Sequence, residues 1–160
     1  MAEPTGEGER RAPRRGTLTL EQILSAFERD RDRHVMAGAA TGADLARLES
    51  ALGCRLPEAL RAFLSRFGGG LFYNGHEIFG PTRTMVHDIE LVPDMLSVRH
   101  RLIEGGSLPE GFLPFHRARG VVNLIDARET VGTGEIVPLS QSPPHPDLAS
   151  FLETVVLPRA

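Results

Sequence analysis

The sequence has no tryptophan and no lysine, and it contains one tyrosine and one cysteine. Because Cys54 is alone, an intramolecular disulfide framework is excluded. No apolar run approaches the roughly 18 residues that a membrane-spanning helix needs. The charged first residues also lack the apolar core of a secretory signal. These absences predict a cytoplasmic protein.

All 18 basic residues are arginine, and with 21 acidic residues they give a net charge of −3. A strongly basic face for nucleic acid is therefore not expected. A chain of 160 residues is long enough for one domain with its own core. Residues 1–16 are rich in charge, proline and glycine, which predicts a flexible arm, so we place the single domain at 17–160.

Two amphipathic helices are predicted over residues 42–52 and 57–67, where leucine and phenylalanine recur at spacings of three and four. Thr41 and Asp44 form a capping-box pattern at the start of the first helix, and Gly53 is placed to end it. The side chains expected in the core include Leu60, Phe63 and Phe67.

A β-hairpin is predicted next, because residues 71–73 and 76–79 flank Asn74-Gly75, the dipeptide that most favours a type I′ turn. Further strands are expected at 121–125 and 135–139, and Pro114 predicts that the strand at 112–115 is an edge or irregular strand.

Other helices are expected from Thr19 to about Arg33, from Asp94 to Gly105, and from about Pro146 onward. In the last of these, one apolar face should comprise Leu148, Phe151, Leu152 and Val155, and residues 34–40 are interpreted as a linker. Together the elements predict an α+β fold, in which an antiparallel sheet packs against several helices.

Candidate catalytic and metal-binding groups do not form a recognisable constellation. The histidines that could bind a metal lack the i, i+4 spacing that puts two ligands on one helix face; they are His76, His87, His100, His116 and His145. No histidine is held near Cys54 by the sequence, and nothing places Asp88 and Glu90 in an apolar pocket. We therefore expect no catalytic residue, no metal, no cofactor and no enzymatic activity.

The order of residues in 41–80 resembles the SUKH superfamily, which contains fungal Smi/Knr-type cell-wall regulators and bacterial toxin-immunity proteins. The matching positions are Leu45, Leu48, Glu49, Leu52-Gly53, Leu56-Pro57, Leu60, Phe63-Leu64, the glycine triplet, Ile78 and Gly80. A second set follows at Leu108-Pro109, 112–115, Gly120, Leu124, Asp126, Val137-Pro138 and 150–152. Gly68 stands where the family usually has asparagine.

The resemblance implies a binding module without catalytic residues or cofactors. Its expected role is that of an immunity protein, which binds and neutralises a toxin domain, often a nuclease or deaminase, without contacting nucleic acid or membrane itself. Two alternatives stay open: a scaffold or regulatory domain of the Smi/Knr type, and a hydrolase that uses histidine and aspartate. A neighbouring toxin reading frame would favour immunity, and a metal bound by His76, His87 or His116 would favour the hydrolase.

The binding surface is expected on loops and exposed strand positions, because the predicted helices use their apolar faces for the core. Tyr73 could anchor an interface, and nearby carboxylates could steer a basic partner. The opposing interpretation is that Tyr73 covers the sheet and the acids are simply solvated. The candidate partner-binding residues are Tyr73, Asn74, Glu77, Asp88, Glu90 and Asp94.

Overall fold

The computed structural model describes residues 17–128, 136–138 and 147–158, and the predicted arm at 1–16 lies outside them. The helices are α2 (Leu20–Arg29), α3 (Gly42–Leu52), α4 (Glu58–Phe67), α5 (Met95–Glu104) and α6 (Leu148–Phe151). The strands are β1 (His34–Met36), β2 (Gly70–Phe72), β3 (His76–Ile78), β4 (Thr84–Val86), β5 (Ile89–Val92), β6 (Phe112–Ala118), β7 (Val121–Asp126) and β8 (Ile136–Pro138). A 3-10 turn η1 (Arg31–Arg33) follows α2, and a π-helical turn η2 (Leu152–Val156) follows α6.

The helix boundaries follow from capping chemistry. The Thr19 and Thr41 side chains each accept the backbone N–H three residues later, and the Gln22 and Asp44 side chains accept the backbone N–H of Thr19 and Thr41 in return. Both helices thus begin with a capping box, and the one at Thr41 is as predicted. Gly53 and Gly68 end α3 and α4 in the left-handed conformation, with φ of 76° and 77°. Helix α2 ends at Arg29, earlier than the predicted Arg33, because the chain tightens into η1.

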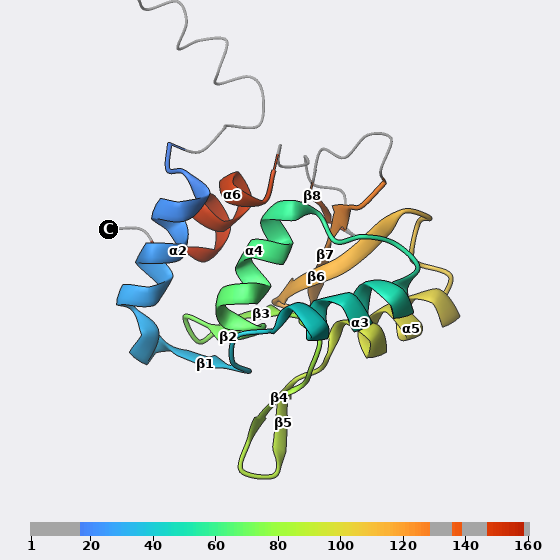
Figure 1. Cartoon of the computed structure of the whole chain (residues 1–160), viewed down its shortest axis with the longest axis horizontal. Helices are drawn as coiled ribbons and strands as arrows, with labels where there is room; N and C mark the ends of the chain where they lie inside the picture. The colour runs from blue at the N-terminus through green and yellow to red at the C-terminus, as the bar shows by residue number, and fades with distance from the viewer. Residues whose placement is uncertain (1–16, 129–135, 139–146, 159–160) are drawn as a thin grey trace, which may run out of the picture.

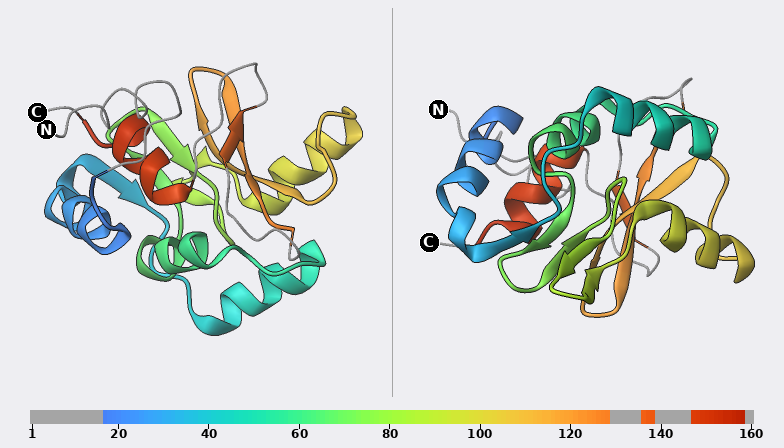
Figure 2. Two further views of the ribbon diagram at one scale, coloured as in Figure 1. Left: turned by 90° about the horizontal axis from the view of Figure 1, so that it is seen from above. Right: turned by 60° about the horizontal axis from the view of Figure 1, so that its bottom comes forward.

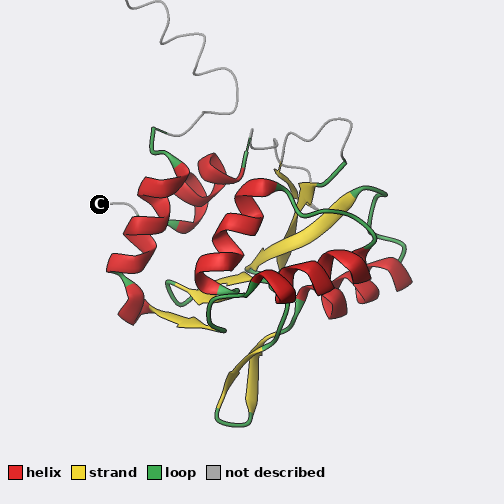
Figure 3. Cartoon of the chain, in the orientation of Figure 1, coloured by secondary structure: helices red, strands yellow, loops and turns green. Residues whose placement is uncertain are grey.

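Six strands form one antiparallel sheet in the order β1-β2-β3-β6-β7-β8, and β4 pairs with β5 in a separate hairpin. Figures 1 and 3 show α2, α4 and α6 grouped at one end of the sheet, α3 and α5 at the other, and the β4–β5 hairpin projecting from the body. The predicted single α+β domain with an antiparallel sheet is confirmed.

One hydrophobic core joins the helices to the sheet. Phe27 of α2 packs edge-on against Phe63 of α4 with ring centroids 5.5 Å apart, and both contact Phe72 of β2. The predicted core residues Leu60, Phe63 and Phe67 are all buried. Burial of such apolar surface is the main favourable contribution to folding.

Residues 34–40 are not simply a linker, because His34–Met36 forms the edge strand β1, with Val35 paired to Leu71. A Cβ atom at Gly70 would lie 2.3 Å from the Val35 carbonyl oxygen, so glycine at that position allows β1 to approach β2. The pairing is non-local, and no local periodicity indicates it.

Strand β6 is irregular, as Pro114 predicts, but it is not an edge strand. It lies between β3 and β7, and its register with β7 shifts between Pro114 and His116. Proline is tolerated there because the hydrogen bonding on the β3 side begins after it: the Phe115 carbonyl oxygen accepts the Phe79 N–H at 2.9 Å, and His116 and Arg117 pair with β3.

The final helical segment buries Val156 in place of the predicted Val155. The reason is the π-helical turn, in which the Leu157 N–H donates to the Leu152 carbonyl oxygen over five residues at 2.8 Å. One extra residue in the turn moves the inward face by one position. Leu148, Phe151 and Leu152 are buried as predicted.

Candidate partner-binding surface

The β4–β5 hairpin combines an anchored base with an exposed tip. At its base Thr84 and Val92 are paired, and each is only 1% exposed. Toward the tip, Met85 is 42% exposed and Ile89 is 65% exposed. Among the described residues, four large apolar side chains are exposed, and these are two of them. Figure 2 shows the hairpin in front of the body when the lower side of the molecule is turned forward.

The predicted residues Asp88 and Glu90 both lie in this hairpin. Asp88 is in the two-residue turn, and Glu90 is paired with Met85 across the hairpin. The Arg83 guanidinium lies 3.6 Å from the Glu90 carboxylate, and both side chains are largely in solvent. Such exposed pairs contribute little to stability, so Glu90 remains accessible to another cation.

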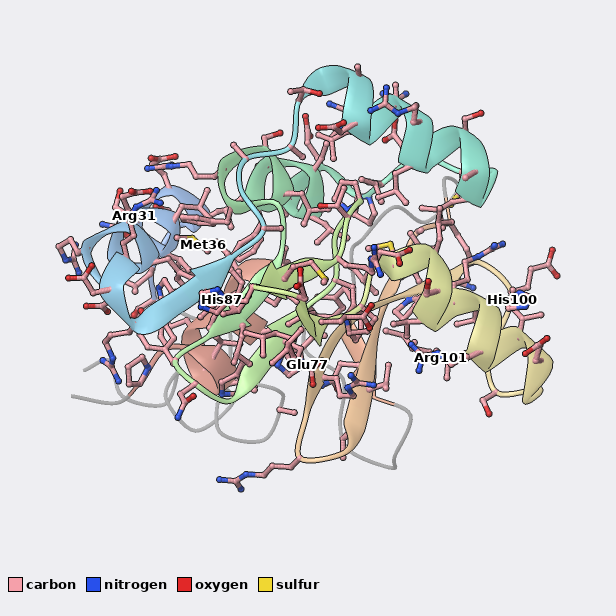
Figure 4. The ribbon with its side chains drawn as sticks, turned by 90° about the horizontal axis from the view of Figure 1, so that it is seen from below. Arg31, Met36, Glu77, His87, His100 and Arg101 are labelled. Carbon is pink, nitrogen blue, oxygen red and sulfur yellow. The ribbon has the colours of Figure 1, made fainter. Side chains whose placement is uncertain are left out.

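Glu77 is in strand β3, and its carboxylate binds Arg117 of β6. The two side chains are directly paired across the strands and form two hydrogen bonds, of 3.0 and 2.7 Å. The Arg117 guanidinium also lies 5.6 Å from the centre of the Phe79 ring. Figure 4 looks onto the side from which the hairpin projects and shows Glu77 and His87 on that side. Glu77 therefore shares a face with the hairpin, although Arg117 already neutralises its charge.

Tyr73 and Asn74 form the β2–β3 turn one residue earlier than predicted. The positive φ angles fall on Tyr73 (50°) and Asn74 (58°), and the Gly75 N–H donates to the Phe72 carbonyl oxygen at 3.2 Å. The predicted turn at Asn74-Gly75 is therefore wrong by one position.

Side-chain contacts explain the position of this turn. The Tyr73 hydroxyl donates to the Asp30 carboxylate at 2.8 Å, and its ring packs edge-on against Phe27 and His34. Burial, followed by the bond to Asp30, raises the pKa of Tyr73 well above its ordinary value. The Tyr73 N–H donates to Nδ1 of His34 at 3.3 Å. Tyr73 thus holds the turn against α2, whereas Asn74 is exposed.

Asp94 caps helix α5. Its carboxylate accepts the Ser97 N–H at 3.1 Å and the Ser97 hydroxyl at 2.7 Å. This is a standard structural role for aspartate at a helix N-terminus. The predicted residues therefore separate into an exposed hairpin pair, an ion-paired strand residue, a turn held against α2 and a helix cap.

His76 and His116 are brought together by the sheet. His76 Nδ1 lies 3.0 Å from His116 Nε2, and His116 Nδ1 lies 3.0 Å from Asn123 Nδ2. Burial, with a smaller effect of His76, lowers the pKa of His116 to about 3. His87 and His100 lie elsewhere, and His145 is outside the described residues. Within the described ranges, no three His, Cys, Asp or Glu side chains are grouped as metal ligands.

Cys54 is half-buried beside Arg99 and Ile103 in an open pocket of about 420 Å³. No helix in the described part of the chain has both the length and the apolar character needed to cross a membrane.

Sequence reasoning missed Met85 and Ile89. Two short apolar runs do flank His87-Asp88, but that dipeptide is not one of the pairs that favour a hairpin turn, so the signal was weak. Exposure of these two side chains depends on where the hairpin leaves the body, which the local sequence does not indicate.

Comparison with known proteins identifies a family and a solved structure with a similar fold. The model of the SMI1 / KNR4 family (SUKH-1) matches residues 39–153. A crystal structure of a protein from Pseudomonas syringae pv. tomato is similar, with a TM-score of 0.65 and 14% sequence identity over 84% of this chain and 96% of that chain. At this identity the likeness shows the fold alone. No curated protein matches the sequence.

Proposed function

The chain belongs to the SMI1/KNR4 family (SUKH-1), and from this membership we propose that it is an immunity protein that binds and neutralises a polymorphic or contact-delivered bacterial toxin. Domains of this family are generally protein-binding modules and not enzymes. The family match carries the proposal, and the exposed apolar and acidic residues of the β4–β5 hairpin support it, because residues on exposed connecting segments are free to bind a partner.

The proposed partner is a nuclease or deaminase domain that acts on nucleic acid. Such a domain needs a basic cleft for the phosphate backbone, and a protein with net charge −3 can complement it. Neutralisation would take place in the cytoplasm, where the substrate of the toxin lies. The immunity function requires no cofactor, metal or catalytic residue of this chain.

The proposed binding surface includes the six residues named from the sequence. Asp88 and Glu90 are best placed, because both carboxylates lie on the exposed hairpin. Asn74 is exposed in its turn, whereas Tyr73, Glu77 and Asp94 already have intramolecular partners. Any contribution of these three to binding would use the part of each side chain that remains in solvent.

The proposal can be tested by affinity purification from the source cell with the full chain carrying a tag. The protein that the chain retains is purified and assayed for nuclease and deaminase activity, alone and with an equimolar amount of the chain. We expect one of these activities, and we expect the folded chain to abolish it while thermally unfolded chain does not. A retained protein with neither activity would contradict immunity and favour the scaffold or regulatory alternative.

A further inference from the structure

The β4–β5 hairpin is built differently at its two ends. Its base is buried at Thr84 and Val92, which fixes where the hairpin leaves the body. Its tip presents Ile89 at 65% exposure and Met85 at 42% exposure, on opposite faces of the hairpin according to the strand pairing. Exposed apolar residues at the tip contribute little to the folded state, so the fold does not account for them.

The turn of the hairpin is also unfavourable for folding. His87, the first turn residue, has φ of 56°, a conformation that glycine adopts readily and that other residues adopt only with backbone strain. Tyr73 has a similar φ, but hydrogen bonds and ring packing compensate there. For His87, the described part of the chain offers no side-chain hydrogen bond, ion pair or ring contact. Uncompensated strain of this kind is a reason to look for function.

The charges on the hairpin indicate the chemistry of its partner. The hairpin carries two carboxylates, Asp88 and Glu90, and one guanidinium, that of Arg83, lies beside it. Asp88 has no cationic partner among the residues that the structure describes, and the pairing of Glu90 with Arg83 is long and solvent-exposed. An apolar tip beside unneutralised carboxylates is complementary to an apolar pocket bordered by arginine or lysine.

We propose that the β4–β5 hairpin inserts into the partner, with Met85 and Ile89 in an apolar pocket and Asp88 and Glu90 against basic side chains at its border. This inference rests on the proposed function for the identity of the partner: in a nucleic-acid-acting toxin, the basic border is the part of the cleft that binds phosphate. The hairpin carboxylates then occupy positions of the phosphate groups. Access of nucleic acid to the cleft is blocked.

The test measures binding of variants to the purified protein that the wild-type chain retains. The apolar variant is Met85→Ser with Ile89→Ser, and the charge variant is Asp88→Asn with Glu90→Gln. The control variant changes the other two large apolar side chains that are exposed in the described part of the chain, Leu18→Ser with Ile103→Ser. Circular dichroism and thermal unfolding establish that each variant folds like the wild type.

We expect the apolar variant to weaken binding by about 10-fold or more and the control variant to have little effect, since a few anchor residues carry most of an interface. The charge variant should associate more slowly, and its association rate should depend less on salt. Sedimentation of the chain alone tests the competing occupant, a second copy: a dimer that the apolar variant dissociates would overturn the proposal.

The outcomes separate the two proposals. If the retained protein is a toxin but binds the apolar variant as tightly as the wild type, the hairpin proposal is wrong and immunity stands. If the retained protein has no toxin activity but the hairpin variants no longer bind that protein, the hairpin proposal stands and immunity is wrong. If the wild-type chain retains no protein, both are overturned.

Discussion

At the scale of single residues, His116 shows how burial fixes a protonation state. The side chain is 1% exposed, packs edge-on against Phe151 with ring centroids 4.9 Å apart, and lies between His76 and Asn123. Because burial lowers its pKa to about 3, the imidazole is neutral in the folded protein at any ordinary pH. In the unfolded chain the same side chain has the ordinary histidine pKa of 6.5.

This difference in pKa between the folded and unfolded protein predicts that the free energy of unfolding decreases as the pH is lowered. The folded pKa of His116 is lowered, so its contribution is fully present above pH 6.5 and is lost as the pH falls from 6.5 toward 3. Between pH 6.5 and 5, where ordinary carboxylates remain charged, the loss of unfolding free energy from this group should steepen from about 0.7 to about 1.4 kcal/mol per pH unit, as the unfolded histidine becomes fully protonated. Urea titrations at a series of pH values measure the slope.

The control for this experiment is His100, which is exposed on α5 and pairs with the exposed Glu104. His116→Phe should flatten the dependence on pH relative to wild type, even if it changes the absolute stability, and the slope of His100→Gln shows the effect of removing an exposed histidine. Since His34 and His76 also have pKa values lowered by burial, a smaller slope should persist in His116→Phe. Equal slopes in His116→Phe and wild type would show that His116 is accessible to protons.

At the scale of elements, the ends of α3 and α4 offer a matched pair of glycines. Gly53 and Gly68 both cap a helix in the left-handed conformation, with φ of 76° and 77°. They differ in their surroundings. A Cβ at Gly53 would meet nothing within 4 Å, whereas a Cβ at Gly68 would lie 1.7 Å from the Gly38 carbonyl oxygen.

Gly53→Ala should therefore cost only the backbone strain, about 1 kcal/mol. Gly68→Ala should cost the same strain and, in addition, about 1–3 kcal/mol because the segment that contains Gly38 must move. Denaturant unfolding of the two variants measures both values. An equal loss of unfolding free energy in the two variants would show that the helix cap alone requires glycine at position 68. The close approach of the two backbones would then have no measurable cost.

At the scale of the whole molecule, the residues that precede helix α2 are hydrogen-bonded to the π-helical turn η2. The Leu18 N–H donates to Glu153 Oε1 at 2.8 Å, and the Thr17 hydroxyl donates to Oε2 at 2.9 Å. The Leu18 N–H in particular holds the pKa of Glu153 below its ordinary value. The stabilisation from these two hydrogen bonds is thus fully present above pH 4.5 and is lost as the pH falls through the lowered pKa of Glu153.

We expect Glu153→Ala to speed amide hydrogen exchange in the first turn of α2 while exchange in α3 and α5 stays as in wild type. Glu104→Ala is a suitable control, because Glu104 is an exposed glutamate on α5 whose carboxylate pairs with His100. Exchange in α2 that is the same in Glu153→Ala and wild type would show that core packing alone holds this helix.

The sequence predicts the helices of this fold better than its strands. Capping boxes and left-handed glycines are local signals, so α3 and α4 begin and end where Thr41, Gly53 and Gly68 predict. Strand β1 and the central position of β6 depend on pairing between distant segments, and no local pattern reports them. The candidate surface follows the same rule: Asp88 and Glu90 could be named as exposed acids, but Met85 and Ile89 could not be recognised as exposed.

The sequence by itself determined the α+β class, the family and the core faces of α2, α3 and α4, because these depend on periodicity and on the order and spacing of residues along the chain. Tertiary structure decided which candidate residues were already engaged. It placed Arg117 against Glu77 and Asp30 against Tyr73, and it left Asp88 in solvent on a projecting hairpin. These relations depend on sheet pairing and on the path of the chain between elements, which bring together residues that the sequence keeps far apart.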